Sequence, residues 1–262
     1  MRNILEEIVE AKRPAVEAAK EKLPLSEVKA RLTVGTRPVA EKLGNARWSL
    51  IAECKLQSPA KGRLTVTHTV DELARVYEAN GAAMLSVHTD PHFLGKSEDL
   101  ARVRKEVSLP LLRKDFVIDP YQVYEARMLG ADAVLLIVRI LPEEVLQPMI
   151  DLAEALGMDA LVEAHGAEDL ERALATTARF IGINNRNLTT FRTDISETLS
   201  LMPQFPSDRI AISESGVLTA DDARTLYKAG CRGVLVGEGL VRAPDTAAMV
   251  REIAGIAKEA EP

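Results

Sequence analysis

From Arg47 onward the sequence repeats one pattern: a short apolar segment, a polar loop, an amphipathic helix and a turn, with a period of roughly 20 to 30 residues. The short apolar segments predict β-strands over 48–55, 83–88, 109–116, 133–138, 160–165, 180–185, 210–214 and 233–237. Eight parallel strands joined by right-handed crossovers close most economically into an α/β fold of the (β/α)8, or TIM, barrel type. A doubly wound open sheet is the alternative, but such sheets usually use fewer strands and begin with a glycine-rich turn that this sequence lacks.

Helix signals follow most of the predicted strands. Thr69 and Asp119 have short polar side chains suited to capping a helix, and Ser97 stands in the same position before acidic residues. The predicted helices span 70–80, 97–107, 120–129, 142–156, 167–175 and 245–259, with one more after a Thr219 cap. Apolar residues also recur at helical spacing in 3–12 and 25–33, which predicts a helical extension over 1–46. No linker divides the sequence, so we expect a single barrel domain over 1–262.

Composition argues against several kinds of partner. The net charge is -6 and the Lys and Arg residues are spread along the chain, which disfavours nucleic-acid and membrane partners and favours a small molecule. The first residues are too polar for a signal peptide, and the longest apolar run, 133–138, is too short to cross a bilayer. Cys54 and Cys231 form no Cys-x-x-Cys motif, so we interpret both as buried small hydrophobic residues. We expect a cytoplasmic protein, either a monomer or a homodimer.

The first predicted strand ends in two opposite charges. Because side chains alternate along a strand, Glu53 and Lys55 share one face while Ala52 and Cys54 share the other. Removing ions from water costs several kcal/mol each unless they are paired or used. The two charges therefore have either a structural or a chemical reason.

Polar residues also stand at the carboxyl ends of other predicted strands: Lys114, Glu163, Asn184, Arg186, Glu214 and Ser215. In a barrel of this class these ends form the active face. Any one of these residues could be a solvated strand end or part of a structural ion pair. The whole set at one mouth indicates a catalytic site.

Two glycine-rich turns follow the last two predicted strands, at Glu214-Ser-Gly216 and at Gly237-Glu-Gly239. Glycine allows backbone N–H groups to approach an anion closely, and the loops after the seventh and eighth strands commonly hold phosphate in such barrels. The pair of turns thus favours a phosphorylated small-molecule ligand over simple tight turns.

The four histidines do not have the spacing of a metal site. His68 and His92 are predicted in loops, His88 ends the second strand, and His165 follows Glu163 on the same strand face. We interpret them as structural or peripheral, with His88 a candidate to line the mouth.

Several segments together match a known family: Ile51-Ala-Glu-Cys-Lys55, Ser58-Pro-Ala-Lys-Gly62, Ser86-Val-His-Thr-Asp90 with Phe93, Leu112-Arg-Lys-Asp-Phe116, Ile118-Asp-Pro-Tyr121, Leu161-Val-Glu163, Ile181-Gly-Ile-Asn-Asn-Arg-Asn-Leu188 and Ser213-Glu-Ser-Gly-Val217. In these segments the chain resembles the indole-3-glycerol phosphate synthases of tryptophan biosynthesis. The likeness extends over nearly the whole chain, and the combination is far more specific than any one segment.

The resemblance implies a lyase that converts 1-(2-carboxyphenylamino)-1-deoxyribulose 5-phosphate into indole-3-glycerol phosphate, CO2 and water, without a metal or an organic cofactor. It implies that Lys114 is the main general acid and that Glu163 stabilises or deprotonates the developing cationic amine. It further implies Lys55 with Glu53 as a second acid and its tuning partner, and Glu214 as another essential carboxylate. The resemblance does not divide the acid and base roles between the two lysines.

The same resemblance implies substrate contacts. Asn184 completes the implied catalytic set by orienting the polar groups of the substrate, Arg186 binds its carboxylate, and Phe93 forms a wall for the aromatic ring. Ser58 begins a loop, within 57–64, that we expect to close over the site. The backbone N–H groups expected to bind the phosphate belong to Ser215, Gly216, Gly237 and Glu238.

The sequence departs from the family pattern at Ala60, where Ser is common, at His88, where Leu is frequent, and at Gly239, where Ser or Ala is frequent. None of these positions carries an assigned chemical role. One alternative is the isomerase that acts one step earlier, but it would pair a Cys or Asp base with an Asp acid, whereas here the first strand ends in Glu53-Cys-Lys55. Another alternative is a ligand-binding barrel without catalysis, which the retained lysines and carboxylates disfavour.

Overall fold

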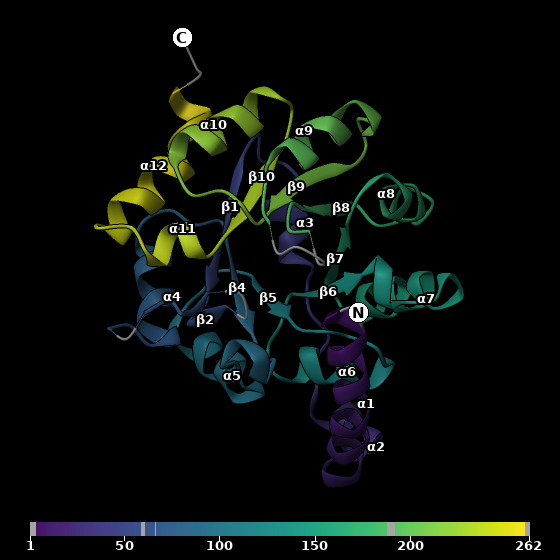
Figure 1. Cartoon of the computed structure of the whole chain (residues 1–262). Helices are drawn as coiled ribbons and strands as arrows, with labels where there is room; N and C mark the ends of the chain where they lie inside the picture. The colour runs from purple at the N-terminus through teal and green to yellow at the C-terminus, as the bar shows by residue number, and fades with distance from the viewer. Residues whose placement is uncertain (1–3, 59–60, 66, 188–191, 260–262) are drawn as a thin grey trace.

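The described residues, 4–58, 61–65, 67–187 and 192–259 of a computed structural model, form a closed barrel of eight parallel strands (Figure 1). The strands are β1 Ser49–Cys54, β4 Met84–His88, β5 Leu111–Lys114, β6 Ala133–Ile137, β7 Asp159–Ala164, β8 Phe180–Asn184, β9 Ile210–Glu214 and β10 Gly233–Val236. The predicted barrel is confirmed. The open sheet is excluded because β1 pairs with both β4 and β10, which leaves no free edge.

Each strand has one face toward the inside of the barrel and one toward the helices. In β1, Leu50 and Cys54 belong to the outer core between strands and helices, whereas Ile51 belongs to the inner core. Glu53 follows Ile51 at a spacing of two and therefore points inward, as the predicted alternation requires. Every strand supplies inner-core residues: Ile51, Met84, Leu112, Ala133, Leu135, Ile137, Leu161, Phe180, Ile210, Ile212 and Leu235.

Helices surround the barrel: α4 Val70–Ala79, α5 Ser97–Glu106, α6 Pro120–Met128, α7 Glu143–Ala155, α8 Ala167–Leu174, α9 Ser196–Leu201, α10 Ala220–Lys228, α11 Glu238–Val241 and α12 Thr246–Glu259. Thr69, Asp119 and Thr219 cap α4, α6 and α10 as predicted. The predicted Ser97 cap is wrong, because Ser97 is the first helical residue of α5. The preceding residue, Lys96, donates its backbone N–H to the Asp99 carboxylate at 3.0 Å. The side chain that stabilises the start of α5 therefore belongs to Asp99, in the first turn of the helix.

The amino-terminal extension contains α1 Ile4–Lys22, α2 Leu25–Arg31 and α3 Pro38–Lys42. The predicted helix over 3–12 is too short, because α1 continues through Pro14. Burial of Leu5, Ile8 and Val16 along α1 outweighs the lost hydrogen bond at that proline. Figure 1 shows α1 and α2 beside α6, while Val39 and Leu43 around α3 join the inner core of the barrel.

The strand predicted over 109–116 is also too long. Pro110 has no N–H to give to the sheet, and after Lys114 the Asp115 carboxylate accepts the N–H of Phe116 at 2.8 Å, which turns the backbone away. Several short elements were not predicted: β2 Gln57–Ser58, β3 Gly62–Arg63, η1 Pro91–Phe93, η2 Val138–Ile140, η3 Met202–Gln204, α3, α9 and α11.

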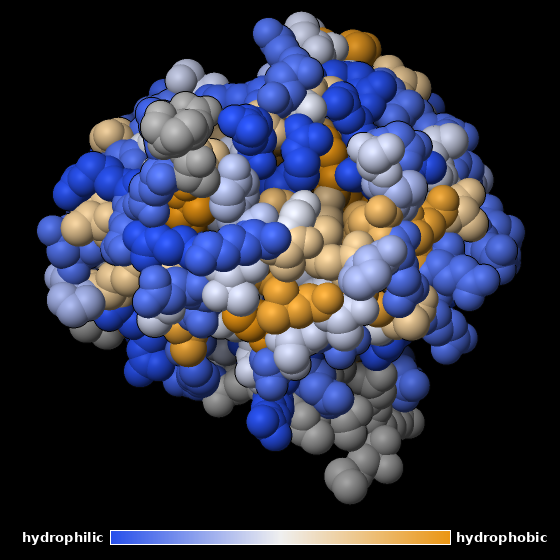
Figure 2. Space-filling model, turned by 90° about the horizontal axis from the view of Figure 1, so that it is seen from above, coloured by the Kyte–Doolittle hydropathy of each residue, from blue (hydrophilic) through white to orange (hydrophobic). Residues whose placement is uncertain are grey.

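The face of the molecule in Figure 2 is mainly hydrophilic, with small groups of hydrophobic side chains between the polar ones. Across the described residues, large hydrophobic side chains are exposed at Leu25, Val34, Leu94 and Leu218. Within those same ranges, no helix combines the length and the apolar character needed to cross a membrane.

Candidate active site

A cavity of about 310 Å³ opens at the carboxyl ends of the barrel strands. Its lining includes every residue that the sequence singled out for the site: Glu53, Lys55, Ser58, Phe93, Lys114, Glu163, Asn184, Arg186, Glu214, Ser215, Gly216, Gly237 and Glu238. The parallel strands bring them together because all eight carboxyl ends meet at one mouth.

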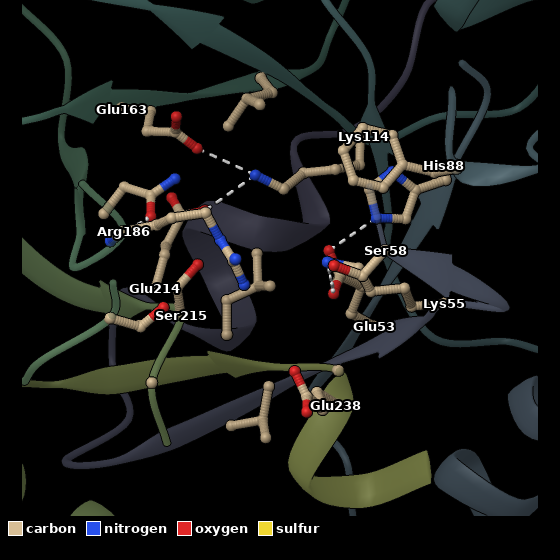
Figure 3. A pocket seen from close by; sticks show the side chains of 18 of the residues that line it. Glu53, Lys55, Ser58, His88, Lys114, Glu163, Arg186, Glu214, Ser215 and Glu238 are labelled. Carbon is tan, nitrogen blue, oxygen red and sulfur yellow. Dashed lines mark hydrogen bonds and ion pairs between the residues drawn. The ribbon is translucent and has the colours of Figure 1, made fainter. Parts of the chain in front are cut away.

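Lys114 lies at the centre of the first charged cluster (Figure 3). Its Nζ donates to Oε2 of Glu163 and to Oε2 of Glu214, each at 2.9 Å. The three side chains come from the ends of β5, β7 and β9. Burial favours the neutral form of Lys114, but the charges of Glu163, Glu214 and Glu53 outweigh it and raise the pKa of the ammonium group. Lys114 is therefore a charged donor in the cavity.

The two carboxyl groups beside Lys114 differ in their proton affinity. Burial favours the neutral form of Glu163, but Lys114, His165 and a hydrogen bond from Asn184 lower its pKa to about 2. For Glu214, burial and the neighbouring charge of Glu163 exceed the opposing effect of Lys114 and raise the pKa to about 8. The two carboxyl groups titrate as a pair, which shares one proton at neutral pH, with Glu163 the stronger acid.

Glu53, Lys55, His88 and Phe93 form the second cluster. Lys55 Nζ lies 3.3 Å from Oε2 of Glu53, and His88 Nε2 lies 2.8 Å from Oε1 of the same carboxylate. Burial would raise the pKa of Glu53, but Lys55, His88 and Lys114 together hold it well below its usual range. The Lys55 ammonium group also lies 5.1 Å from the centre of the Phe93 ring, within the range of a cation–π contact.

Glycines make room for two of these carboxylates. A Cβ atom at Gly182 would overlap an oxygen of Glu214, and a Cβ atom at Gly237 would overlap an oxygen of Glu53. The sequence singled out Gly237 for the phosphate, whereas the structure gives it this additional steric role. Gly182 belongs to the segment Ile181–Leu188 that resembles the family, but nothing within that segment indicates that Gly182 lies against Glu214.

The loops after β9 and β10 form the part of the cavity wall between β8 and β1. Ser215 and Gly216 have positive φ angles of 64° and 86°, a conformation in which the chain turns sharply. Asn185 holds this turn, because its Nδ2 donates to the backbone oxygens of Glu214 at 3.0 Å and Ser215 at 2.9 Å. After β10 the predicted turn is the start of the short helix α11.

The prediction for Glu238 concerned its backbone N–H group and not its side chain. Its side chain in fact pairs with Lys61 at 2.7 Å, on the loop that follows β1, and with Arg242 at 3.0 Å. The pair with Lys61 links the loops that follow two neighbouring strands, β1 and β10. Residues 59–60 of the loop expected to close over the site lie outside the described residues, and they include Ala60, one of the departures from the family pattern. Leu188, the last residue of one segment that resembles the family, lies outside them too.

Sequence reasoning missed the contribution of the amino-terminal extension. Leu5 and Ile8 of α1 line the cavity. One turn further, Lys12 Nζ pairs with Asp90 at 2.5 Å and with Asp115 at 2.6 Å. The only local signal was the run of charges at Arg113-Lys-Asp115 in an otherwise apolar segment, and it did not identify a partner in α1.

The remaining histidine of the cavity is His165. It lines the cavity with its Nε2 atom 3.5 Å from Oε1 of Glu163, and burial lowers its pKa. The sequence placed it on the face of Glu163, and the structure agrees. In the part of the chain that the structure describes, no group of three or more His, Cys, Asp or Glu side chains is arranged to hold a metal ion.

Solved structures with a similar fold include two of low sequence identity. The structure of 3-hexulose-6-phosphate synthase from Salmonella typhimurium matches with a TM-score of 0.64 and 14% sequence identity, covering 81% of this chain and 100% of that one. Thiamine phosphate pyrophosphorylase from Pyrococcus furiosus matches with a TM-score of 0.59 and 17% identity, covering 82% and 97%. At such low identity these matches show the fold alone.

Comparisons of the sequence are more specific. An indole-3-glycerol phosphate synthase of Carboxydothermus hydrogenoformans is 46% identical over 252 residues, which cover 92% of this chain and 96% of that protein. Another, from Desulfosudis oleivorans, is 44% identical over 260 residues, covering 97% and 99%. The model of the indole-3-glycerol phosphate synthase family matches residues 5–253. The chain belongs to the indole-3-glycerol phosphate synthase family.

Proposed function

We propose that the cavity at the strand ends converts 1-(2-carboxyphenylamino)-1-deoxyribulose 5-phosphate into indole-3-glycerol phosphate. The observation that supports this most strongly is the placement of two lysines, Lys114 and Lys55, in one cavity, each beside its own carboxylate. The reaction needs acids at an oxygen that leaves as water and a negative charge near an amine that becomes positive. Family membership supplies the reaction, and the geometry supports our assignment of residues to its steps.

Ring closure comes first in the proposed sequence. The aromatic carbon that carries the carboxylate attacks the ketone carbon, while Lys114 donates a proton to the ketone oxygen and turns it into a hydroxyl group. The aryl amine becomes positive in this step. Glu163 is ionised because its pKa is low, and it lies 2.9 Å from Lys114, so it is placed to stabilise that charge.

Decarboxylation and dehydration follow. The bond to the carboxyl carbon breaks, CO2 leaves, and its electron pair restores the aromatic ring. The hydroxyl group then leaves as water with one added proton, and the methylene carbon next to the nitrogen loses a proton, which yields the indole. We assign the added proton to Lys55, supported by Glu53, and the acceptance of the methylene proton to the Glu163 carboxylate. Glu214 accepts a hydrogen bond from Lys114 and helps to hold that lysine in place.

The remaining polar groups bind and orient the substrate in this proposal. Figure 3 shows Arg186 directed into the cavity, where it suits the substrate carboxylate, and Asn184 supports Glu163. Phe93 provides an apolar wall for the aromatic ring, and Ser58, buried at the cavity edge, contributes a hydroxyl group. The turns at Ser215, Gly216, Gly237 and Glu238 supply backbone N–H groups for the phosphate.

The alternative function, that of the isomerase acting one step earlier in tryptophan biosynthesis, is less well supported. It would use a Cys or Asp base at the end of the first strand. Cys54 belongs to the outer core, on the face opposite to Glu53, and burial raises the pKa of its thiol. A thiol that points away from the cavity and resists ionisation is not suited to proton abstraction.

Three expectations stay predictions: a single domain over 1–262 with 1–46 as its extension, a cytoplasmic location, and a monomeric or homodimeric state. The contacts of Lys12 with Asp90 and Asp115 support the first, because they join the extension to the barrel.

The decisive experiment incubates the purified protein with 1-(2-carboxyphenylamino)-1-deoxyribulose 5-phosphate and follows indole fluorescence. We expect indole-3-glycerol phosphate to accumulate in step with CO2 release. Intact substrate and no product, with protein shown to be folded, would contradict the proposal.

A further inference from the structure

His88 is the one titratable side chain of the second cluster to which no role has been given. It ends β4, between β1, which carries Glu53, and β5, where Lys114 stands in register with it. Both His88 and Glu53 are nearly fully buried, with exposed fractions of 5% and 4%. A polar ring in such a position needs a partner, and its two faces and two nitrogens can serve different neighbours.

The first neighbour is the Glu53 carboxylate, as Figure 3 shows. Burial, together with the charges of Lys55 and Lys114, lowers the pKa of His88 despite the opposing effect of Glu53. The ring is therefore neutral at pH 7. Since its Nε2 faces a carboxylate oxygen at 2.8 Å, the single ring proton lies on Nε2 and is donated to Glu53. Oε1 of Glu53 is thus occupied by His88, while Oε2 faces Lys55 at 3.3 Å.

The second neighbour is the Phe93 ring. The two ring centres are 4.3 Å apart and the planes are 12° from parallel, so His88 stacks on Phe93. Phe93 also carries the ammonium group of Lys55 near its centre. One imidazole thus contacts the carboxylate that pairs with Lys55 and the aromatic ring that lies beside Lys55.

We propose that His88 is a positioning residue, which orients Glu53 toward Lys55 through its hydrogen bond and holds Phe93 against the cavity through its ring. The inference rests on the proposed synthase activity and deepens it. The two contacts serve different parts of the reaction: the hydrogen bond supports the second acid, and the stack supports the apolar wall for the substrate ring. The two contacts are therefore separable by substitution.

Two variants separate these contacts. His88→Phe keeps a ring that can stack but loses the donor, and we expect kcat to fall about ten-fold with KM nearly unchanged, as the loss of one hydrogen bond to a charged group predicts. His88→Gln keeps an amide donor but loses the ring, and we expect KM to rise about five-fold with kcat within about two-fold of wild type, because Phe93 loses its stacking partner. His68→Phe, outside the cavity, is the control and should match wild type.

A double-mutant cycle tests whether His88 acts through Glu53. In a Glu53→Gln background, the effect of His88→Phe on kcat should largely disappear, since the carboxylate that His88 orients is absent. A purely structural histidine would reduce the yield of folded enzyme but would not produce opposite kcat and KM patterns or this loss of additivity. Should His88→Phe fail to fold, His88→Leu, which loses both the donor and the ring, is compared with His88→Gln, which loses the ring alone, and the difference in kcat between them reports on the donor.

The outcomes are distinct. If the wild-type protein is active and both His88→Phe and His88→Gln have its kcat and KM, the proposed role of His88 is wrong, while the synthase activity is supported. Equal losses in His88→Phe and His88→Gln, or a fully additive cycle, would overturn it as well. No turnover by the wild-type protein would overturn both proposals.

Discussion

Replacement of Lys114 is the sharpest test of the proposed chemistry. In Lys114→Ala the two carboxyl groups that accept from Nζ at 2.9 Å lose their shared cation. The two carboxyl groups share one proton at neutral pH, since the pKa of Glu214 is raised to about 8, so one negative charge is left unpaired. Removing one partner of a buried ion pair typically costs about 3 to 5 kcal/mol, which corresponds to roughly 6 to 20 °C in Tm for a protein of this size.

That destabilisation should depend on pH in a definite direction. The pKa of Glu163 is lowered from 4.5 to about 2 in the folded protein, chiefly by Lys114 acting against burial. Such a carboxylate stabilises the fold above the unfolded pKa, and the contribution is lost as pH falls through the folded pKa. The difference in free energy of unfolding between wild type and Lys114→Ala should therefore be largest at neutral pH and shrink between pH 4.5 and 2.

Turnover should fall much further than stability. Loss of a positioned general acid costs a factor of about a hundred to ten thousand, measured by indole fluorescence at a temperature where the variant is folded. Binding of the phosphorylated substrate, measured by calorimetry, should persist because the phosphate turns are untouched. Lys114→Met removes the charge but keeps most of the side-chain volume, and its turnover should fall as far as that of Lys114→Ala. Lys20→Ala, which removes surface pairs with Glu17 and Asp119, is the control. Full turnover in folded Lys114→Ala would refute the assignment.

Three further substitutions extend the test. Glu214→Gln should gain stability relative to wild type as pH rises from 4.5 to about 8. The pKa of Glu214 is higher in the folded than in the unfolded protein, so the wild type loses stability over that range while the variant, which cannot titrate there, does not. A difference in free energy of unfolding that does not change with pH would contradict this. Gly182→Ala should lower kcat more than ten-fold with little loss of fold, since its Cβ displaces the Glu214 carboxylate, and unchanged kinetics would rule out the steric role. Lys12→Met should speed hydrogen exchange in α1 but not in the barrel strands, because Asp90 and Asp115 lose their link to that helix, and equal protection in both proteins would show that the link is dispensable.

The membership of the site was predictable because it depends on a local rule. Strand alternation places Glu53 and Lys55 on one face, and the end of each apolar segment marks a position at the mouth, so Lys114, Glu163 and Glu214 could be assigned from their own neighbours in sequence. The resemblance to a family added their chemical roles. Every one of those residues lines the cavity.

The partners within the site were not predictable in the same way. Lys12 meets Asp115 across 103 positions of sequence, and His88 meets Glu53 across 35. Lys114 pairs with two carboxyl groups and Lys55 with one. This difference depends on how neighbouring strands are staggered around the closed barrel. No pattern within a single segment carries that information.

By itself the sequence determined that this chain builds a (β/α)8 barrel, and which ionisable residues stand at its carboxyl-terminal mouth. Both follow from short-range periodicity, since a period of two sets the face of a strand and a repeated strand–helix unit sets the topology. Only the tertiary structure decided that the pKa of Glu163 is lowered while that of Glu214 is raised, and that His88 faces Glu53. The reason is physical: burial and Coulomb interactions act through space, so a pKa depends on atoms that the fold, and not the order of residues, brings within a few ångströms.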